Sequence, residues 1–499
     1  MKLNFDVYKD QVYACWIGKN IGGTMGAPYE GKREVLDIKG FASKAGEPLP
    51  NDDLDLQLIW LHAMETTGPY DLDCKKLGEY WISYISPHWN EYGMGKLNMK
   101  HGLLPPLSGD YENTWKDSNG AWIRTEIWAT LAPGCPEIAT KYAVEDAMVD
   151  HGAGEGTFAA AFVAAMQSAA FIEKDIRKCI DAALSLIPAT SRVGSTVLKI
   201  LECYDNGVSW LDCRNAVQQM NADIGDGWFE APSNVGYAVL GLIYGEGDFK
   251  KSMITAINCG DDTDCTGATV GATLGILGGT AAIPADWRDY IGDGIITMSI
   301  AEGILYNIPK TCAELTERVV HMAPTVLWAN RAEVTLVRSG DEEEYAIPMP
   351  IERAVSGPAA KSPVLRRLEA LKPYQFEVDA GIFRVRVTYD RAPNIAPDEE
   401  LGVTLTFIHP VMRKYRNVSA FGNMPRMLNL RWWLPEGFVV TGKRTVVIEH
   451  CTSHHRVPQK DIHVTIKAGE CVEALNRVVL EVTADGRPTA CYVPMNLMG

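Results

Sequence analysis

Apolar residues recur at helical spacing through the first three fifths of the chain. One predicted helix begins at Asn51, and its apolar residues lie on one face: Leu54, Leu58, Leu61 and Met64. The other predicted helices cover residues 7–18, 21–27, 136–149, 157–172, 191–203, 213–220, 234–244 and 250–258. This part of the chain is therefore expected to fold as an all-α domain.

The last third of the chain has a different pattern, in which short runs of β-branched and apolar residues alternate with turn residues. These runs cover residues 334–337, 383–389, 403–408, 428–433, 445–449, 462–466 and 478–482. Their spacing predicts a β-sandwich. Since 499 residues exceed one comfortable core, we expect a multidomain protein, with a helical domain at 1–325, a connecting segment at 326–375 and a smaller all-β domain at 376–499.

Residues 267–284 form an apolar run in which Gly267, Gly271, Gly275 and Gly278 recur at helical spacing. Each glycine costs about 1 kcal/mol in helix propensity, which close packing of a neighbouring helix must recover. The run falls short of the roughly 20 residues that cross a bilayer. It therefore predicts a buried central helix.

Three carboxylates, Asp261, Asp262 and Asp264, stand directly before this run. Two carboxylates about 4 Å apart repel by roughly 4 kcal/mol at an effective dielectric near 20, so a cluster at the edge of a core needs a cation or protons. A second acidic group, at 51–53, opens the helix that follows it, and N-capping accounts for only one or two of these residues. We expect the two groups to meet around a divalent metal.

Residues 80–122 are irregular and rich in aromatic and amide side chains, among them Trp89 and Tyr92. Two interpretations are equally good: a long loop that packs on the helices, or a platform for a sugar or a base. The segment ends in Asn119 and Gly120 before a predicted helix, a geometry that offers backbone N–H groups to an anion. His151, taken alone, is more typical of a structural residue at a helix end.

The composition excludes some classes of function. The formal net charge of -16 argues against binding to a nucleic-acid backbone, which needs a basic footprint. The 12 cysteines form no CxxC pair, and the N-terminus lacks the apolar core of a signal peptide. We expect reduced thiols in a cytoplasm and no membrane association, and we leave open a homo-oligomer.

With these segments in place, the helical part of the chain resembles the ADP-ribosylglycohydrolase family. Residues 18–30 are similar to the family's small-residue segment that ends in a Glu, here Glu30. Residues 51–53 stand where the family has Thr-Asp-Asp. Residues 119–124 resemble its Asn-Gly-x-x-x-Arg loop, His151 falls where the family has a His before a helix, and residues 260–275 resemble its Gly-Gly-Asp-Thr-Asp-Thr segment with the helix after it.

This resemblance implies an all-α fold with two Mg²⁺ ions, or Mn²⁺, at the bottom of a cleft. It assigns the metal ligands to Asp52, Asp53, Asp262 and Asp264, with Asn51 and Cys265 at positions where the family has Thr. All-oxygen ligation also favours magnesium or manganese over zinc, and a thiol is a poor partner for magnesium. Asp261, where Gly is usual, is expected to add an oxygen.

The implied roles of the other residues follow from the same resemblance. Glu30 and Asp53 are the expected catalytic residues, and the pocket for the rest of the substrate is expected to include Asn119, Gly120 and His151, with Tyr92 from the aromatic segment. The C-terminal part loosely resembles the immunoglobulin-like accessory modules of carbohydrate-active enzymes.

The leading hypothesis is therefore a metal-dependent glycosyl hydrolase that cleaves a bond at an anomeric carbon, with Glu30 as general base. ADP-ribosyl groups on protein or on a small molecule are the implied substrates. One alternative is a glycoside or nucleoside hydrolase that acts on another sugar, which the aromatic segment favours. The other is a non-catalytic sugar- or nucleotide-binding relative, which the residues at 51 and 265 favour.

Overall fold

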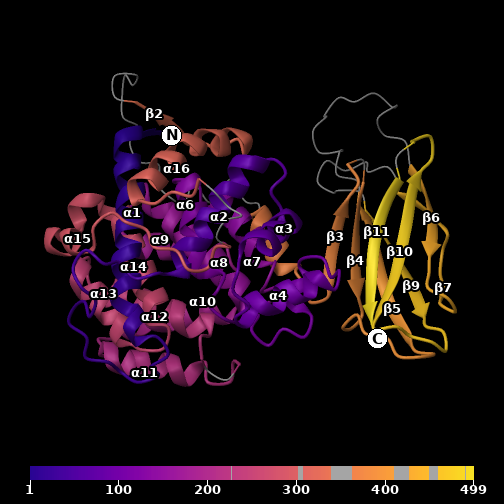
Figure 1. Ribbon diagram of the computed structural model, residues 1–499, viewed down its shortest axis with the longest axis horizontal. Helices are drawn as coiled ribbons and strands as arrows, with labels where there is room; N and C mark the ends of the chain where they lie inside the picture. Colours follow the sequence, from indigo (N-terminus) through magenta and orange to yellow (C-terminus); the bar gives the residue numbers. More distant parts are fainter. Residues whose placement is uncertain are drawn as a thin grey trace. The chain divides into compact units, whose positions relative to one another are not determined.

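The computed structural model describes residues 1–225, 228–301, 307–338, 362–381, 383–408, 426–448, 459–488 and 490–499. They form two compact units, one of residues 1–96 and 113–371 and one of residues 97–112 and 372–499. Figure 1 labels most of the helices of the first unit and most of the strands of the second. A helical domain followed by antiparallel β-sheets confirms the predicted fold class.

The first unit is built almost entirely of helices, as the apolar spacing predicts. Short 3-10 turns η1 (Ala27–Tyr29), η2 (Trp122–Arg124) and η3 (Thr280–Ala282) connect some of them. The helices are α1 (Phe5–Gly26), α2 (Asp52–Thr67), α3 (Cys74–Tyr84), α6 (Glu126–Leu131), α7 (Pro136–Ala147), α8 (Glu155–Ala170), α9 (Ile176–Leu184), α10 (Arg192–Asp205), α11 (Trp210–Met220), α12 (Ala231–Tyr244), α13 (Phe249–Asn258), α14 (Thr263–Gly278), α15 (Ala285–Ile291), α16 (Cys312–Ala329) and α18 (Pro363–Glu369). None of the described helices combines the length and apolar composition needed to cross a bilayer.

Helices α1 and α14 pack against each other along a seam of glycines. A Cβ atom on Gly18 would overlap the carbonyl of Gly271, and one on Gly22 would overlap that of Gly267. The contact is antiparallel, so the end of α1 meets the start of α14, where the Thr263 hydroxyl donates to the Gly26 carbonyl at 2.8 Å. α1 is one continuous helix rather than the two that were predicted, because close packing recovers the cost of its glycines.

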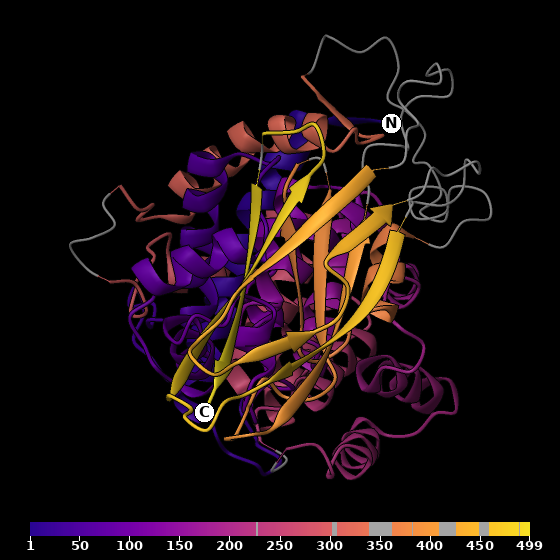
Figure 2. The same ribbon diagram turned by 90° about the vertical axis from the view of Figure 1, so that its right-hand side faces the viewer.

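The second unit is a pair of antiparallel sheets (Figure 2). One sheet has the order β3-β4-β5-β9-β7 and the other β11-β10-β6-β8, and apolar residues of both sheets share one core. The strands are β3 (Gln375–Asp379), β4 (Arg384–Tyr389), β5 (Glu400–Ile408), β6 (Arg426–Trp433), β7 (Val439–Thr441), β8 (Thr445–Ile448), β9 (Gln459–Lys467), β10 (Leu475–Ala484) and β11 (Ala490–Met498).

Two segments depart from the expected division of the chain. β2 (Thr335–Val337) pairs in parallel with β1 (Lys2–Asn4) inside the first unit, so it is no strand of the sandwich. Residues 97–112, expected in the helical domain, belong to the second unit because Leu103, Leu107 and Tyr111 are buried in its core. This segment holds the end of α4 (Asn90–Lys100) and α5 (Leu107–Asp110). Of the expected connection at 326–375, residues 339–361 lie outside the described residues.

Candidate active site

The first unit contains a cavity of about 630 Å³. Its walls come from segments far apart in sequence: the turn after α1, the start of α2, the start of α4, the loop before η2 and the start of α14. Carboxylates line it together with aromatic and amide groups. The acids are Glu30, Asp52, Glu91, Asp262 and Asp264, and the other polar or aromatic residues include Asn51, Trp89, Tyr92, Asn119, Phe229 and Cys265.

The two acidic groups of the sequence meet at this cavity. Asn51 is the N-cap of α2 and accepts the Asp53 N–H at 2.8 Å, which fixes the two aspartates in the first turn. Asp264 lies in the first turn of α14, where the dipole favours negative charge. The Cys265 thiol donates to Oδ1 of Asp53 at 3.3 Å, so residues more than two hundred positions apart are in contact.

At one end of the cluster, Glu30, Asp262 and Asp264 each offer a carboxylate oxygen, and these atoms lie within 4.8 Å of one another. Asn119 donates to Oδ2 of Asp262 at 2.6 Å. Among the described residues, no group hydrogen-bonds Oδ1 of Asp262 or Oδ1 of Asp264, although both atoms are buried. Buried, unpaired carboxylate oxygens are costly unless a cation joins them. Two such oxygens, together with the exposed carboxylate of Glu30 beside them, suit a hard divalent ion.

Repulsion between these neighbouring carboxylates also raises their pKa values. The negative charge of Asp264 raises the pKa of Glu30 to about 8, with further contributions from burial and from Asp52. Burial raises the pKa of Asp52 to about 6, and Asp264 adds to the rise. The pKa of Asp262 also rises well above its usual range because of burial and the nearby charges of Asp264 and Glu30. A bound cation would reverse these shifts.

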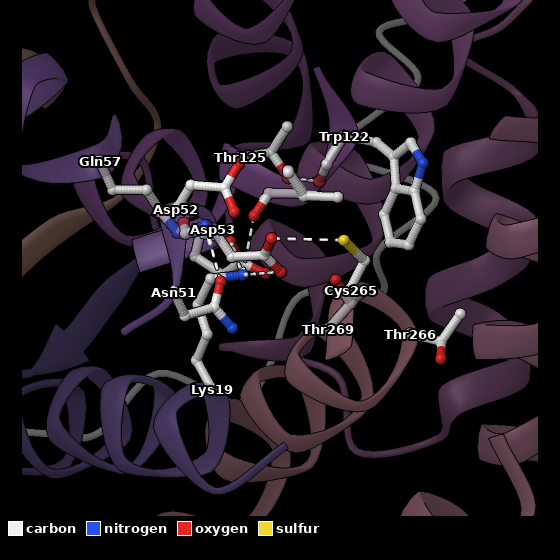
Figure 3. A network of polar contacts seen from close by, with 12 residues as sticks. Lys19, Asn51, Asp52, Asp53, Gln57, Trp122, Thr125, Cys265, Thr266 and Thr269 are labelled. Atoms are coloured by element: carbon white, nitrogen blue, oxygen red, sulfur yellow. Dashed lines mark hydrogen bonds and ion pairs between the residues drawn. The ribbon is translucent and has the colours of Figure 1, made fainter. Parts of the chain in front are cut away.

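At the other end, Asp53, Asp264 and Cys265 form a second group with ligand atoms within 4.8 Å. This end already has a cation of the protein's own. Nζ of Lys19, from α1, lies 3.6 Å from Oδ2 of Asp53 and 3.1 Å from Oε2 of Glu126, and all three side chains are almost completely buried. Figure 3 shows Lys19, Asp53 and Cys265 converging from three helices.

Lys19 is a residue that the sequence analysis missed. Burial lowers its pKa, but Glu126 and Asp53 outweigh burial and raise it overall, so the side chain is an ammonium ion. Its position in an apolar stretch of α1, between Gly18 and Asn20, was the one available signal. A thiol and an ammonium ion fit a hard divalent ion poorly. The structure thus offers one position that suits such an ion and one that does not.

The cavity wall includes part of the expected pocket. The Tyr92 hydroxyl donates to Oδ2 of Asp52 at 2.8 Å. The centroid of the Tyr92 ring lies 6.4 Å from that of the Trp89 ring, and the two ring planes are inclined by 30°. Trp89 is 47% exposed. Asn119 is held by the Trp122 indole N–H at 2.9 Å. The aromatic segment therefore both packs on the helices and lines the cavity.

His151, expected to line the pocket, does not reach the cavity. Its side chain is fully buried, with Nδ1 2.8 Å from Oδ1 of Asp150 and Nε2 3.4 Å from Oγ of Ser118. Asp150 in turn pairs with Arg124 at 2.8 Å. His151 therefore supports the loop at 118–120 from behind.

Asp261 also differs from expectation. Its carboxylate accepts the Asn234 amide at 2.9 Å, and its backbone has a φ of 67°. Its backbone N–H and carbonyl bond to residues 32 and 31, which ties the loop after α1 to the start of α14. Asp261 therefore gives no oxygen to either acid group, because its side chain is used by Asn234.

A comparison with protein families agrees with the helical architecture of the first unit. A family model described as ADP-ribosylglycohydrolase matches residues 5–326. A solved structure titled "ADP-ribosylglycohydrolase-related protein complex" is 18% identical, with a TM-score of 0.43, over 65% of this chain and 99% of that one. A FixG-related protein from Vibrio parahaemolyticus is 15% identical, with a TM-score of 0.18, over 24% and 97%. No curated protein matches.

Proposed function

Because the chain belongs to the ADP-ribosylglycohydrolase family, we propose that it is a divalent-metal-dependent hydrolase of a glycosidic bond at an anomeric carbon. The observation that carries the proposal is the set of buried carboxylate oxygens of Asp262 and Asp264 that have no partner among the described residues, beside Glu30 in the cavity wall. A cation stabilises such oxygens in their ionised form, and their position at the cavity makes that cation accessible to a substrate.

The metal is Mg²⁺, with Mn²⁺ as the substitute, held by Glu30, Asp262 and Asp264. When bound there, the ion supplies an anchor for sugar hydroxyls and lowers the pKa of water. Two ions were expected from the family resemblance, but Lys19 and Cys265 occupy the surroundings of the second position. We therefore assign one hard ion to this chain.

The chain's own residues provide the remaining chemistry. Glu30 offers one carboxylate oxygen to the ion, so its other oxygen is the general base that takes a proton from the attacking water. A cation beside Asp264 would lower the raised pKa of Glu30 and leave it ionised near neutral pH. Asp53 does not line the cavity and is paired with Lys19, so we assign it to positioning the cluster. Asn119 and Tyr92 hold Asp262 and Asp52 in place from the cavity side.

The second candidate is a protein that binds a sugar or nucleotide without cleaving it. The observation that favours it is the buried ion pair in which Lys19 neutralises the charge of Asp53. This pair leaves fewer carboxylates free to bind metal than two ions need. Both candidate functions use the same cavity, but only the hydrolase would turn over its ligand.

Metal content and hydrolysis test the proposal together. The purified chain is stripped with chelator, reloaded with magnesium and analysed for bound metal by mass spectrometry; we expect about one ion per chain. Asp262→Ala should lose this ion, and unchanged magnesium in Asp262→Ala contradicts the assigned site. Release of the leaving group from aryl glycosides or ADP-ribosylated protein, dependent on magnesium, separates the enzyme from the binding protein.

For the second unit we propose an immunoglobulin-like topology. The pairing β4-β5-β9-β7 on one sheet and β11-β10-β6 on the other matches strands A-B-E-D and G-F-C of that fold, with β3 and β8 as additional edge strands. A reducing cytoplasm is the proposed location, since every cysteine in the described residues is free and all but Cys471 are buried.

A further inference from the structure

One carboxylate in the cavity has no role in the proposed hydrolysis. Glu91, in the first turn of α4, is only 6% exposed and still lines the cavity. Its Oε2 atom is buried and has no hydrogen-bond partner among the described residues. Because a buried carboxylate oxygen without a partner is costly, the position of this Oε2 atom in the wall calls for an explanation in terms of what the cavity accepts.

Glu91 lies against the loop at 118–120. The other oxygen of its carboxylate, Oε1, is so close to Gly120 that a Cβ atom on that residue would overlap it, and would also meet the Tyr92 ring. Within this loop the Ser118 N–H is already donated to the Trp115 carbonyl at 3.0 Å. Glu91 therefore brings a carboxylate to this loop where the loop borders the cavity.

The rest of the cavity offers little to a phosphate. None of the described residues that line it is a lysine or an arginine, whereas five are carboxylates. The nearest buried cations are already engaged. Arg124 donates to Asp146 at 3.0 Å and to Asp150 at 2.8 Å, and Lys19 is paired with Glu126 and Asp53. One divalent ion offsets only part of this negative charge.

The remaining surface suits an uncharged sugar. The rings of Trp89, Tyr92 and Phe229 line the cavity, and aromatic faces pack against the C–H groups of a sugar ring. Asn51 and the acids supply hydrogen-bond partners for hydroxyl groups. Neither the aromatic packing nor the hydrogen bonding to hydroxyl groups requires a phosphate on the ligand.

We propose that Glu91 is a specificity residue that excludes phosphate, so that the substrate of this chain is an uncharged glycoside and not an ADP-ribosyl compound. The inference rests on the proposed function for the location of the reaction. It adds that the phosphates of ADP-ribose would meet like charge in a cavity lined by five carboxylates, Glu91 among them, which penalises binding.

Calorimetric titration with ADP-ribose tests the proposal without requiring turnover. The full chain, loaded with magnesium, is compared with Glu91→Gln, which removes the charge and keeps the size of the side chain. The titrations are run at about pH 8, because burial raises the pKa of Glu91 and its carboxylate has to be ionised. We expect Glu91→Gln to bind ADP-ribose at least about tenfold more tightly than the wild type.

The control is Glu79→Gln, which removes the same charge from an exposed position on α3 and should change ADP-ribose binding less than about twofold. Glu91→Met provides a second uncharged side chain, and circular dichroism melting checks that each variant is folded. Equal affinity of wild type and both Glu91 variants for ADP-ribose, whether tight or absent, overturns the proposal. So does magnesium-dependent release of ADP-ribose by the wild type, a result that would leave the proposed hydrolase function intact.

Discussion

The two ends of the acid cluster contain the same residue type in opposite electrostatic states. At the end formed by Glu30, Asp262 and Asp264, oxygens remain unpaired among the described residues. At the end formed by Asp53, the ammonium of Lys19 and the thiol of Cys265 face the carboxylate. The difference shows that the number of metal ions cannot be inferred from an acidic motif alone. It also depends on whether the fold already supplies a cation of its own to the carboxylates.

Replacement of Lys19 has the largest expected effect on stability. Lys19→Met keeps the volume but leaves Glu126 and Asp53 buried without a cation, so we expect a loss of about 3–5 kcal/mol in the free energy of unfolding, measured by urea denaturation in chelator. Added manganese should recover part of the loss and enter as a second ion, seen as spin coupling in the electron paramagnetic resonance spectrum.

A matched control lies on the same helix. Lys9 forms an exposed ion pair with Glu317, and Lys9→Met should cost less than about 1 kcal/mol. If Lys19→Met were as mild as Lys9→Met, the end of the cluster around Asp53 would not depend on an internal cation.

Asp264 belongs to both groups of the cluster, so its loss should remove most of the activity. We expect Asp264→Asn to lower kcat/KM by about 100- to 1000-fold and to abolish tight magnesium binding, because the site loses a central negative oxygen. The control Asp261→Asn changes an acid three positions away whose side chain is bound to Asn234, and it should retain bound magnesium. Equal loss of metal in both variants would mean that magnesium binding depends on the net charge of the cluster rather than on the position of each carboxylate.

The smallest effect is the dependence of stability on pH in the metal-free chain. The folded pKa values of about 8 for Glu30 and about 6 for Asp52 exceed the values of 4.5 and 3.8 that these groups have when unperturbed. Between these limits the folded chain binds more protons than the unfolded chain, so stability falls as the pH rises from about 5 to about 8. Melting curves in chelator should show this decline, and saturating magnesium should suppress it. A melting temperature that rises over this range in chelator would contradict the assignment.

Much of the fold could be predicted from the sequence because its signals are local. Helical periodicity and the glycines of α14 identify the helical unit, and the family resemblance supplied the pairing of acids that periodicity cannot give. Lys19 was missed because a lone lysine in an apolar helix usually extends its amine to solvent. Glu91 was one acid within an aromatic segment, with no pattern to mark its burial. β11 was missed because Pro494 interrupts its alternation, which an edge strand tolerates.

The membership of residues 97–112 in the second unit has a practical consequence for dissecting the protein. A truncated chain that ends before residue 372 would retain Leu103, Leu107 and Tyr111 but lose the sheets that cover them. Freshly uncovered apolar side chains promote aggregation, so insolubility of such a truncation would say nothing about whether the helical unit folds. Likewise, a single protease cut near residue 372 would not separate the two units, because residues 97–112 would still join them through the chain.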